Sequence, residues 1–310
     1  MSITISGGIT LASGGWTVTA APPSQPTASW FSGATFDRIT YATDTATATA
    51  RGPMIASTYR NAAAGNLNYG YYGGGNPGPN TSAVQRITYA NDTATSTYKG
   101  PLSLGRRSFA AAGNTDYGWF MGGWTGSAVT DTIDRIDYAN DTATASVRGP
   151  LAAARYRTSA AFSTSSYAWF CGGMIFPTSF SNIQRVDFAT DTSTASDRGS
   201  LTTVLYSSAA TANATYGWVG GGGYPYFPQI SLVNRITVAN DTITASVRGP
   251  LSADTYLHAA SGNNSYGWFA GGGLGSNVNR IDYSNDTPTA GVRGPLSAVN
   301  GQNSSTAGVQ

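Results

Sequence analysis

The residue types that most often perform catalysis are scarce in this chain of 310 residues. His258 is the single histidine and Cys171 the single cysteine. An imidazole-based zinc or copper site needs several such ligands, and a Ser-His-Asp triad would have to be built around His258 alone. Asp131, Asp134 and Asp137 cluster near one predicted loop, but nothing else supports a glycosidase carboxylate pair. We therefore expect no enzyme activity, no catalytic residue, no metal site and no cofactor, with Cys171 and His258 packed in the core.

Regularly spaced charged residues are abundant instead. An arginine opens a similar stretch six times, and a second basic residue follows each arginine by 13 positions. Each stretch also carries an aspartate in an NDT or TDT turn. A catalytic group is rarely needed six times in one chain, so we expect these side chains to form partly buried ion pairs within or between repeats. The opening arginines are Arg38, Arg86, Arg135, Arg185, Arg235 and Arg280, and the aspartates are Asp44, Asp92, Asp141, Asp191, Asp241 and Asp286.

The repeat itself indicates how these residues are positioned. Successive opening arginines are 48, 49, 50, 50 and 45 residues apart. Each repeat divides into a small apolar strand such as 108–113, an aromatic strand ending in glycines such as 117–123, the RIDY strand, and a Thr/Ala alternation such as 142–146. The chain has no Glu and one Lys, which disfavours helix. Four short strands in a unit of this length are typical of a propeller blade.

The two ends of the chain predict how the ring closes. The first copy lacks the first strand, and the residues after the last RGPLSA suffice for one strand only. We expect residues 304–309 to complete the first blade, which removes an open sheet edge. The sequence thus predicts an all-β, six-bladed β-propeller of four-stranded antiparallel blades over residues 27–310. Residues 1–26 would form an N-terminal arm or linker.

The aromatic strand with its glycine doublet resembles kelch-type propellers. Tyr117 and Trp119 precede Gly122 and Gly123, whereas kelch blades place a tryptophan well after the glycines, so the resemblance is to a divergent branch. The sequence pattern YGWF–GG, RIDY–NDTATAS–RGPLS also resembles repeat proteins encoded by marine bacteriophages. The stretch MSITISGGITLASGG is similar to the N-termini of small phage structural proteins. The resemblance implies a component of a phage virion.

Loop variation predicts which face binds a partner. In an antiparallel meander, the turns after the first and third strands share one face, and the remaining loops share the other. The turns after the third strand are nearly uniform, whereas the loops at 172–184 and 220–234 are long and aromatic. We expect these loops to bind a ligand or, alternatively, to pack over the channel mouth or over each other. The candidate binding residues are Phe176, Phe180, Tyr224, Tyr226 and Phe227.

Five basic residues lie outside the repeat positions, in the loops that precede the first strands of blades two to four. We expect them to form a basic arc on the varied face that meets an acidic surface, such as an anionic glycan or another protein, or else a solvated rim. They are Arg60, Arg106, Arg107, Arg155 and Arg157.

Composition limits the partners. A net charge of +2 argues against nucleic acid, and the absence of a long apolar run argues against membrane insertion. The first residues lack the features of a secretory signal. Alternation at Ile3, Ile5, Ile9 and Leu11 suits strand addition to a partner's sheet, or equally a loose tail.

These features favour a non-enzymatic structural protein of the virion, in a tail, fibre or capsid decoration. It would bind other virion proteins through its N-terminal arm and present the propeller to a protein or a host surface, and an oligomer is compatible with this role. One alternative is a lectin-like propeller that binds host-surface glycan. Another is a hydrolase or lyase acting at the channel mouth.

Overall fold

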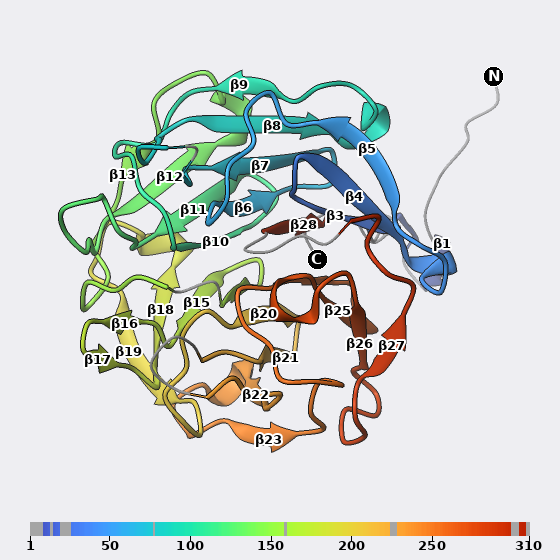
Figure 1. The fold of residues 1–310 in the computed structure, drawn as a ribbon. Helices are drawn as coiled ribbons and strands as arrows, with labels where there is room; N and C mark the ends of the chain where they lie inside the picture. Colours follow the sequence, from blue (N-terminus) through green and yellow to red (C-terminus); the bar gives the residue numbers. More distant parts are fainter. Residues whose placement is uncertain are drawn as a thin grey trace, which may run out of the picture.

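Six four-stranded antiparallel sheets form a ring around a central axis in the computed structural model (Figure 1). The helical segments in the described part of the chain are three-residue 3-10 turns, and none of them is long enough to cross a membrane. The predicted all-β, six-bladed propeller is therefore confirmed. The structure describes residues 9–12, 15–18, 26–76, 78–157, 160–223, 228–298 and 304–307.

We call the four strands of each blade A, B, C and D, in the order in which they pair. Strand A lies at the axis of the ring and strand D at its rim (Figure 1). Blade one consists of β28 (Ser305–Ala307), β3 (Ala28–Phe31), β4 (Thr35–Thr40) and β5 (Thr49–Pro53). Blade two consists of β6 (Ala62–Gly65), β7 (Tyr69–Gly73), β8 (Val84–Thr88) and β9 (Thr97–Lys99). Blade three consists of β10 (Ala110–Gly113), β11 (Tyr117–Met121), β12 (Ile133–Asp137) and β13 (Ser146–Val147).

Blades four to six repeat the pattern. Blade four consists of β14 (Ala161–Ser163), β15 (Tyr167–Cys171), β18 (Asn182–Asp187) and β19 (Ser196–Ser200). Blade five consists of β20 (Ala209–Ala212), β21 (Tyr216–Gly220), β22 (Val233–Thr237) and β23 (Ser246–Arg248). Blade six consists of β24 (Ala259–Gly262), β25 (Tyr266–Ala270), β26 (Val278–Asp282) and β27 (Gly291–Arg293).

Short elements fill the connections. The 3-10 turns η1 to η5 follow strand C in blades one to five, and η6 follows strand B of blade six. They are η1 (Tyr41–Thr43), η2 (Tyr89–Asn91), η3 (Tyr138–Asn140), η4 (Phe188–Thr190), η5 (Val238–Asn240) and η6 (Gly272–Leu274). Among the described residues, two hairpins lie outside the blades. They are formed by β1 (Ile9–Ala12) with β2 (Gly15–Val18) and by β16 (Met174–Ile175) with β17 (Thr178–Ser179).

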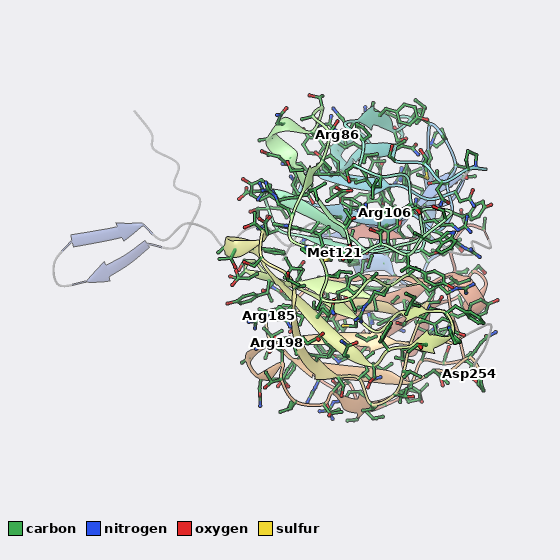
Figure 2. The ribbon with its side chains drawn as sticks, turned by 90° about the vertical axis from the view of Figure 1, so that its left-hand side faces the viewer. Arg86, Arg106, Met121, Arg185, Arg198 and Asp254 are labelled. Atoms are coloured by element: carbon green, nitrogen blue, oxygen red, sulfur yellow. The ribbon has the colours of Figure 1, made fainter. Side chains whose placement is uncertain are left out.

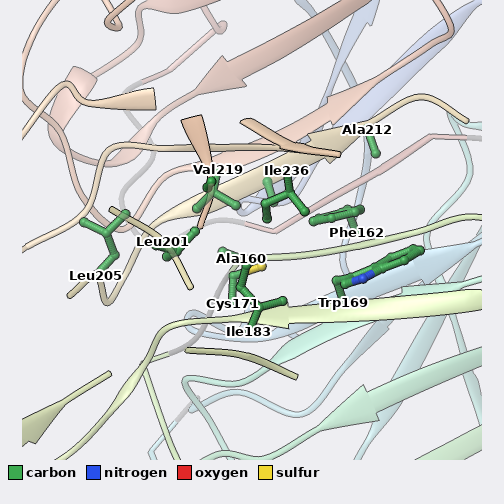
Figure 3. Close-up of a cluster of buried hydrophobic side chains, with 12 residues drawn as sticks. Ala160, Phe162, Trp169, Cys171, Ile183, Leu201, Leu205, Ala212, Val219 and Ile236 are labelled. Atoms are coloured by element: carbon green, nitrogen blue, oxygen red, sulfur yellow. The ribbon is translucent and has the colours of Figure 1, made fainter. Parts of the chain in front are cut away.

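The core lies in the seams between blades, because each sheet is covered on both faces by its neighbours. Strands B of blades two to six expose only their first residue partly and bury the rest. Figure 3 shows one seam, where Phe162, Trp169 and Cys171 of blade four face Val219 and Ile236 of blade five. Burying each large ring in such a seam contributes roughly 2–3 kcal/mol.

The C-terminal strand closes the ring, as the sequence predicts. Strand β28 pairs antiparallel with β3, so that Ser305 lies opposite Phe31 and Thr306 opposite Trp30. The Ser32 backbone N–H also donates to the Ser304 carbonyl at 2.9 Å. The prediction is confirmed over residues 304–307, and Val309 lies outside the described residues.

The N-terminal arm contributes one described feature. Strands β1 and β2 pair with each other, with Ile9 opposite Val18 and Leu11 opposite Trp16. Figure 2 shows this hairpin on the side of the ring that carries Arg185 and Arg198. Ile3, Ile5 and most other residues up to 25 lie outside the described residues, so strand addition to a partner remains a prediction.

Every seam contains one buried carboxylate that binds three donors of the preceding blade. Asp191 of blade four accepts a hydrogen bond from Trp119 Nε1 at 2.9 Å and pairs with Arg135 Nη1 at 3.0 Å and Arg148 Nε at 3.6 Å. We call each such group a seam knot. The predicted pairing of repeat arginines with turn aspartates therefore occurs between neighbouring blades. The knots centre on Asp44, Asp92, Asp141, Asp191, Asp241 and Asp286.

The backbone reinforces each knot. The Gly149 N–H in the RGP motif donates to the Asp191 carbonyl at 2.8 Å, and equivalent glycines make the same bond in the other five seams. A Cβ at Gly149 would overlap the carbonyl oxygen of Ser193. The glycine of this motif is thus required by the close approach of two blades.

Aromatic stacking completes the seams. The Trp119 ring stacks on Phe188 of the next blade with centroids 3.7 Å apart. One seam differs, because the next blade offers Val238 at the equivalent position. There Trp169 instead stacks on Phe162 of its own blade, with centroids 5.1 Å apart. The exception shows that the indole face is covered even where the repeat lacks an aromatic residue.

Truncating the chain after Ala298 tests ring closure. We expect the free energy of unfolding to fall by about 3 kcal/mol, since three paired positions are lost at about 1 kcal/mol per backbone hydrogen bond. The exposed edge of β3 should also promote association. Urea unfolding and light scattering measure the two effects. A chain that ends at Ala307 keeps β28 and serves as the control, and equal stability of the two chains would contradict closure by β28.

Candidate functional site

The two faces of the ring differ in structure. The A–B and C–D turns share one face, where the Tyr138 N–H of the C–D turn donates to the Asp116 carbonyl of the A–B turn at 3.0 Å. The B–C and D–A loops share the opposite face. Figure 2 shows Arg185 and Arg198 on one side of the ring and Asp254 of a D–A loop on the other. The varied loops therefore surround the opposite mouth of the channel.

A chain of backbone hydrogen bonds runs around that mouth. The Ser108 N–H donates to Arg60 O at 2.9 Å, and the Arg157 N–H donates to Ser108 O at 2.7 Å. Ser207 then donates to Arg157 and Leu257 to Ser207, at 2.7 and 2.8 Å. All five residues have φ between 54° and 60°, a strained left-handed backbone that is retained in five blades. We call Arg60, Ser108, Arg157, Ser207 and Leu257 the mouth ring.

Two members of the predicted basic arc are buried, so the prediction is wrong for Arg106 and Arg155. The Arg106 side chain is 0% exposed, and its Nη1 lies 2.9 Å from Asp134. Arg106 and Arg155 occupy a D–A loop position that later blades fill with Leu205 and Thr255. The four positions are equivalent because the backbone carbonyl of each residue accepts a hydrogen bond from the backbone N–H of the second glycine after a strand B. Their side chains fill the interior and hold loops together.

Arg155 ties the long loop of blade four to the scaffold. Its Nη1 donates to the Gly172 carbonyl at 2.9 Å and to Asn182 Oδ1 at 3.0 Å. Burial lowers the pKa of Arg155 to about 10, and the charge of Asp197 offsets this only in part. The guanidinium lies 4.6 Å from the centroid of the Phe180 ring. Phe180, which the sequence predicts to bind a ligand, therefore packs against Arg155.

The remaining three arginines gather at the mouth. Arg60 and Arg157 belong to the mouth ring on either side of Ser108, and Arg107 immediately precedes Ser108. All three are partly exposed. Arg107 Nη1 donates to Asn80 Oδ1 at 3.1 Å. Burial lowers the pKa of Arg60, and the nearby charges of Arg157 and Arg107 lower it further. The predicted arc is therefore reduced to a compact group of three.

The aromatic loop residues are placed only in part. Phe176 lies between β16 and β17 and is 59% exposed, beside the exposed Ile175. Tyr224, Tyr226 and Phe227 lie outside the described residues. Phe176 is therefore the more exposed of the two candidates that the structure describes, since Phe180 is partly buried beside Arg155.

The mouth carries aromatic residues that the sequence predictions missed. Tyr59 and Tyr156 directly precede the mouth-ring arginines, and Tyr59 is 46% exposed. Trp124 exchanges two backbone hydrogen bonds with Arg107, at 2.9 and 3.1 Å, and its ring centroid lies 5.9 Å from that of Tyr156. The signal was present in the repeat, because four of the five mouth-ring residues follow a tyrosine.

The channel below the mouth is narrow. A cavity of about 100 Å³ is lined by the inner strands and by Asn61, Phe109, His258 and Ser304. His258 is fully buried, and burial lowers its pKa to about 4, although a backbone hydrogen bond with Gly220 acts in the opposite direction. The described residues contain no group of three or more His, Cys or Asp side chains arranged to hold a metal ion.

Cys171 lies in the apolar seam between blades four and five. It is buried, and burial raises the pKa of its thiol well above the usual range. A thiol in this state is unreactive, so the side chain serves as a core residue.

The fold has counterparts among solved structures. One of them is the structure of YjhT, which matches with a TM-score of 0.66 at 12% sequence identity, over 79% of this chain and 86% of that chain. At this identity the likeness shows a shared propeller fold and no more. No protein-family model matches the sequence, and no curated protein does.

Replacing His258 by Phe tests its buried neutral state. Burial lowers the pKa of His258 from 6.5 to about 4, so between these pH values the imidazole is protonated in the unfolded chain and neutral in the folded chain. Stability is therefore lost as the pH falls through this window. We expect the free energy of unfolding to fall between pH 7 and pH 4.5 by about 2 kcal/mol less in His258→Phe than in the unaltered chain. Phe109 occupies the equivalent position in blade three, so the fold already accommodates a phenyl side chain there.

Urea unfolding at several pH values measures this difference. The aspartates titrate in both proteins and therefore cancel in the comparison. An identical pH dependence of the two proteins would show that His258 titrates freely in the folded chain.

Proposed function

We propose that this chain is a non-enzymatic structural protein of a bacteriophage virion, which presents its propeller for interaction with a protein or a host surface. The observation that carries the proposal is the division of charged groups between the two faces. The twelve repeat basic residues and six turn aspartates are used in seam knots, so they hold the scaffold together. The varied loops on the opposite face are left for binding.

The positions of the chain ends support attachment through the N-terminal arm. The Thr27 carbonyl accepts from the Tyr41 N–H at the start of a C–D turn, so the chain enters blade one on the uniform face. An arm that leaves from this face would attach the ring to other virion proteins and leave the mouth ring outward. The resemblance of the repeats to proteins encoded by marine phages supports the same role.

A lectin-like role is the second candidate, and one observation favours it. The mouth alternates partly exposed aromatic and guanidinium side chains, at Tyr59, Arg60, Arg107, Tyr156 and Arg157. Aromatic faces and charge-assisted hydrogen bonds together are suited to a sugar ring and its polar substituents. This role is compatible with a place on a virion, since a host surface presents glycans.

Removing residues 2–26 tests the attachment role. We expect the full chain to be found in purified phage particles and to enter them during assembly, and the shortened chain to enter at least tenfold less. Quantitative mass spectrometry of gradient-purified particles measures both. Circular dichroism shows whether the shortened chain keeps its sheet structure.

The variant Phe176→Ala keeps the arm and is the matched control, expected to enter particles normally. Equal incorporation of the full and shortened chains would exclude the arm as the anchor. Absence of the full chain from the particles would refute the virion role itself.

A further inference from the structure

We infer that the channel mouth is a binding site for an acidic saccharide, in which Arg60, Arg107 and Arg157 bind a sugar carboxylate and the adjacent aromatic side chains contact the sugar ring. The inference specifies a ligand class for the varied face and rests on the proposed binding role of that face.

The three arginines are held together by backbone structure. Arg60 and Arg157 are both bonded to Ser108 in the mouth ring, at 2.9 and 2.7 Å, and Arg107 is the residue before Ser108. Asn80 accepts from the Arg107 guanidinium and, through its amide nitrogen, donates to the Trp124 carbonyl at 2.9 Å. The group is therefore preorganised, which reduces the entropic cost of binding a ligand.

Two of the three arginines have no carboxylate partner in the part of the chain that the structure describes. Among the described residues, Arg107 and Arg157 form no ion pair, whereas the repeat arginines and Arg106 all do. The six knot aspartates lie near the opposite face, and Asp134 is occupied by Arg106. Bringing like charges together is unfavourable, and the pKa of Arg60 is lowered partly for this reason. An anion at the mouth would relieve this repulsion and accept the paired N–H groups of a guanidinium.

The aromatic side chains distinguish a saccharide from a bare anion. Trp124 and Tyr156 form a pair with centroids 5.9 Å apart, beside Arg107 and Arg157. Tyr59 is 46% exposed on the other side of the group. Such rings bind the apolar face of a pyranose while their polar edges remain in water. An acidic peptide would use the arginines as well, so the experiment includes one.

The experiment measures binding by isothermal titration calorimetry at low and physiological salt. The acidic probe is a tetrasaccharide that alternates glucuronic acid with N-acetylglucosamine, and the neutral probe is a tetramer of N-acetylglucosamine. A short polyglutamate peptide and sodium acetate are the further probes. We expect the acidic tetrasaccharide to bind at least tenfold more tightly than every other probe, and to weaken with added salt.

The repeats supply variants that the fold already accepts. Arg60→Ser and Arg157→Ser place at these positions the residue that Ser108 and Ser207 provide in other blades, with the same left-handed backbone. We expect each to weaken binding of the acidic tetrasaccharide at least tenfold. Leu257→Ser changes the same kind of position without removing charge, and should bind as the unaltered chain does.

Three results would overturn the inference even where the probes bind. They are equal binding of the neutral tetramer, tighter binding of the peptide or acetate than of the acidic saccharide, and an equal loss in Leu257→Ser and Arg157→Ser. If none of the probes binds while the full chain is present in phage particles, this inference fails and the virion role stands.

Discussion

One buried carboxylate per seam holds the propeller together. In the seam between blades two and three, burial alone would raise the pKa of Asp141, but hydrogen bonds from Tyr71 and Lys99 and the charge of Arg86 lower it overall. The carboxylate is therefore ionised and paired across the seam. Because the last of the six knots joins Asp44 of blade one to Arg280 of blade six, the pairing returns to its starting point and constrains the whole ring.

This constraint also divides the molecule into two faces. The knots require an aspartate turn, a spacing of 13 residues between two basic side chains, and a glycine where the blades approach closely, and all of these lie away from the mouth. The loops at the mouth take no part in the knots, so their lengths and residues vary without loss of the ring. Arg60, Arg107 and Arg157 gather there because the mouth ring brings neighbouring D–A loops side by side.

The repeat predicted the blades and the use of arginine with aspartate, because strict periodicity reflects constraints shared by every blade. The incomplete first copy and the residues after the last copy predicted the closure. The repeat did not distinguish pairs within a blade from pairs between blades. The basic arc was partly wrong because a charged side chain suggests exposure, whereas Arg106 and Arg155 fill positions that Leu205 and Thr255 occupy elsewhere. Comparing blades position by position would have revealed this, and also the tyrosines beside the mouth. The placement of Trp124 against Tyr156 depends on loop conformation, which no repeat encodes.

The most direct test of the seam knots is urea unfolding of Asp191→Asn beside Asp187→Asn. Asp187 lies in the same blade, and among the described residues its side chain accepts a hydrogen bond from Ala189 N in its own turn. The knot arginines are about one fifth exposed, so we expect Asp191→Asn to lower the free energy of unfolding by about 2–3 kcal/mol, somewhat less than for a fully buried pair. Asp187→Asn should change it by less than about 0.5 kcal/mol. Equal and small effects of both substitutions would contradict the account.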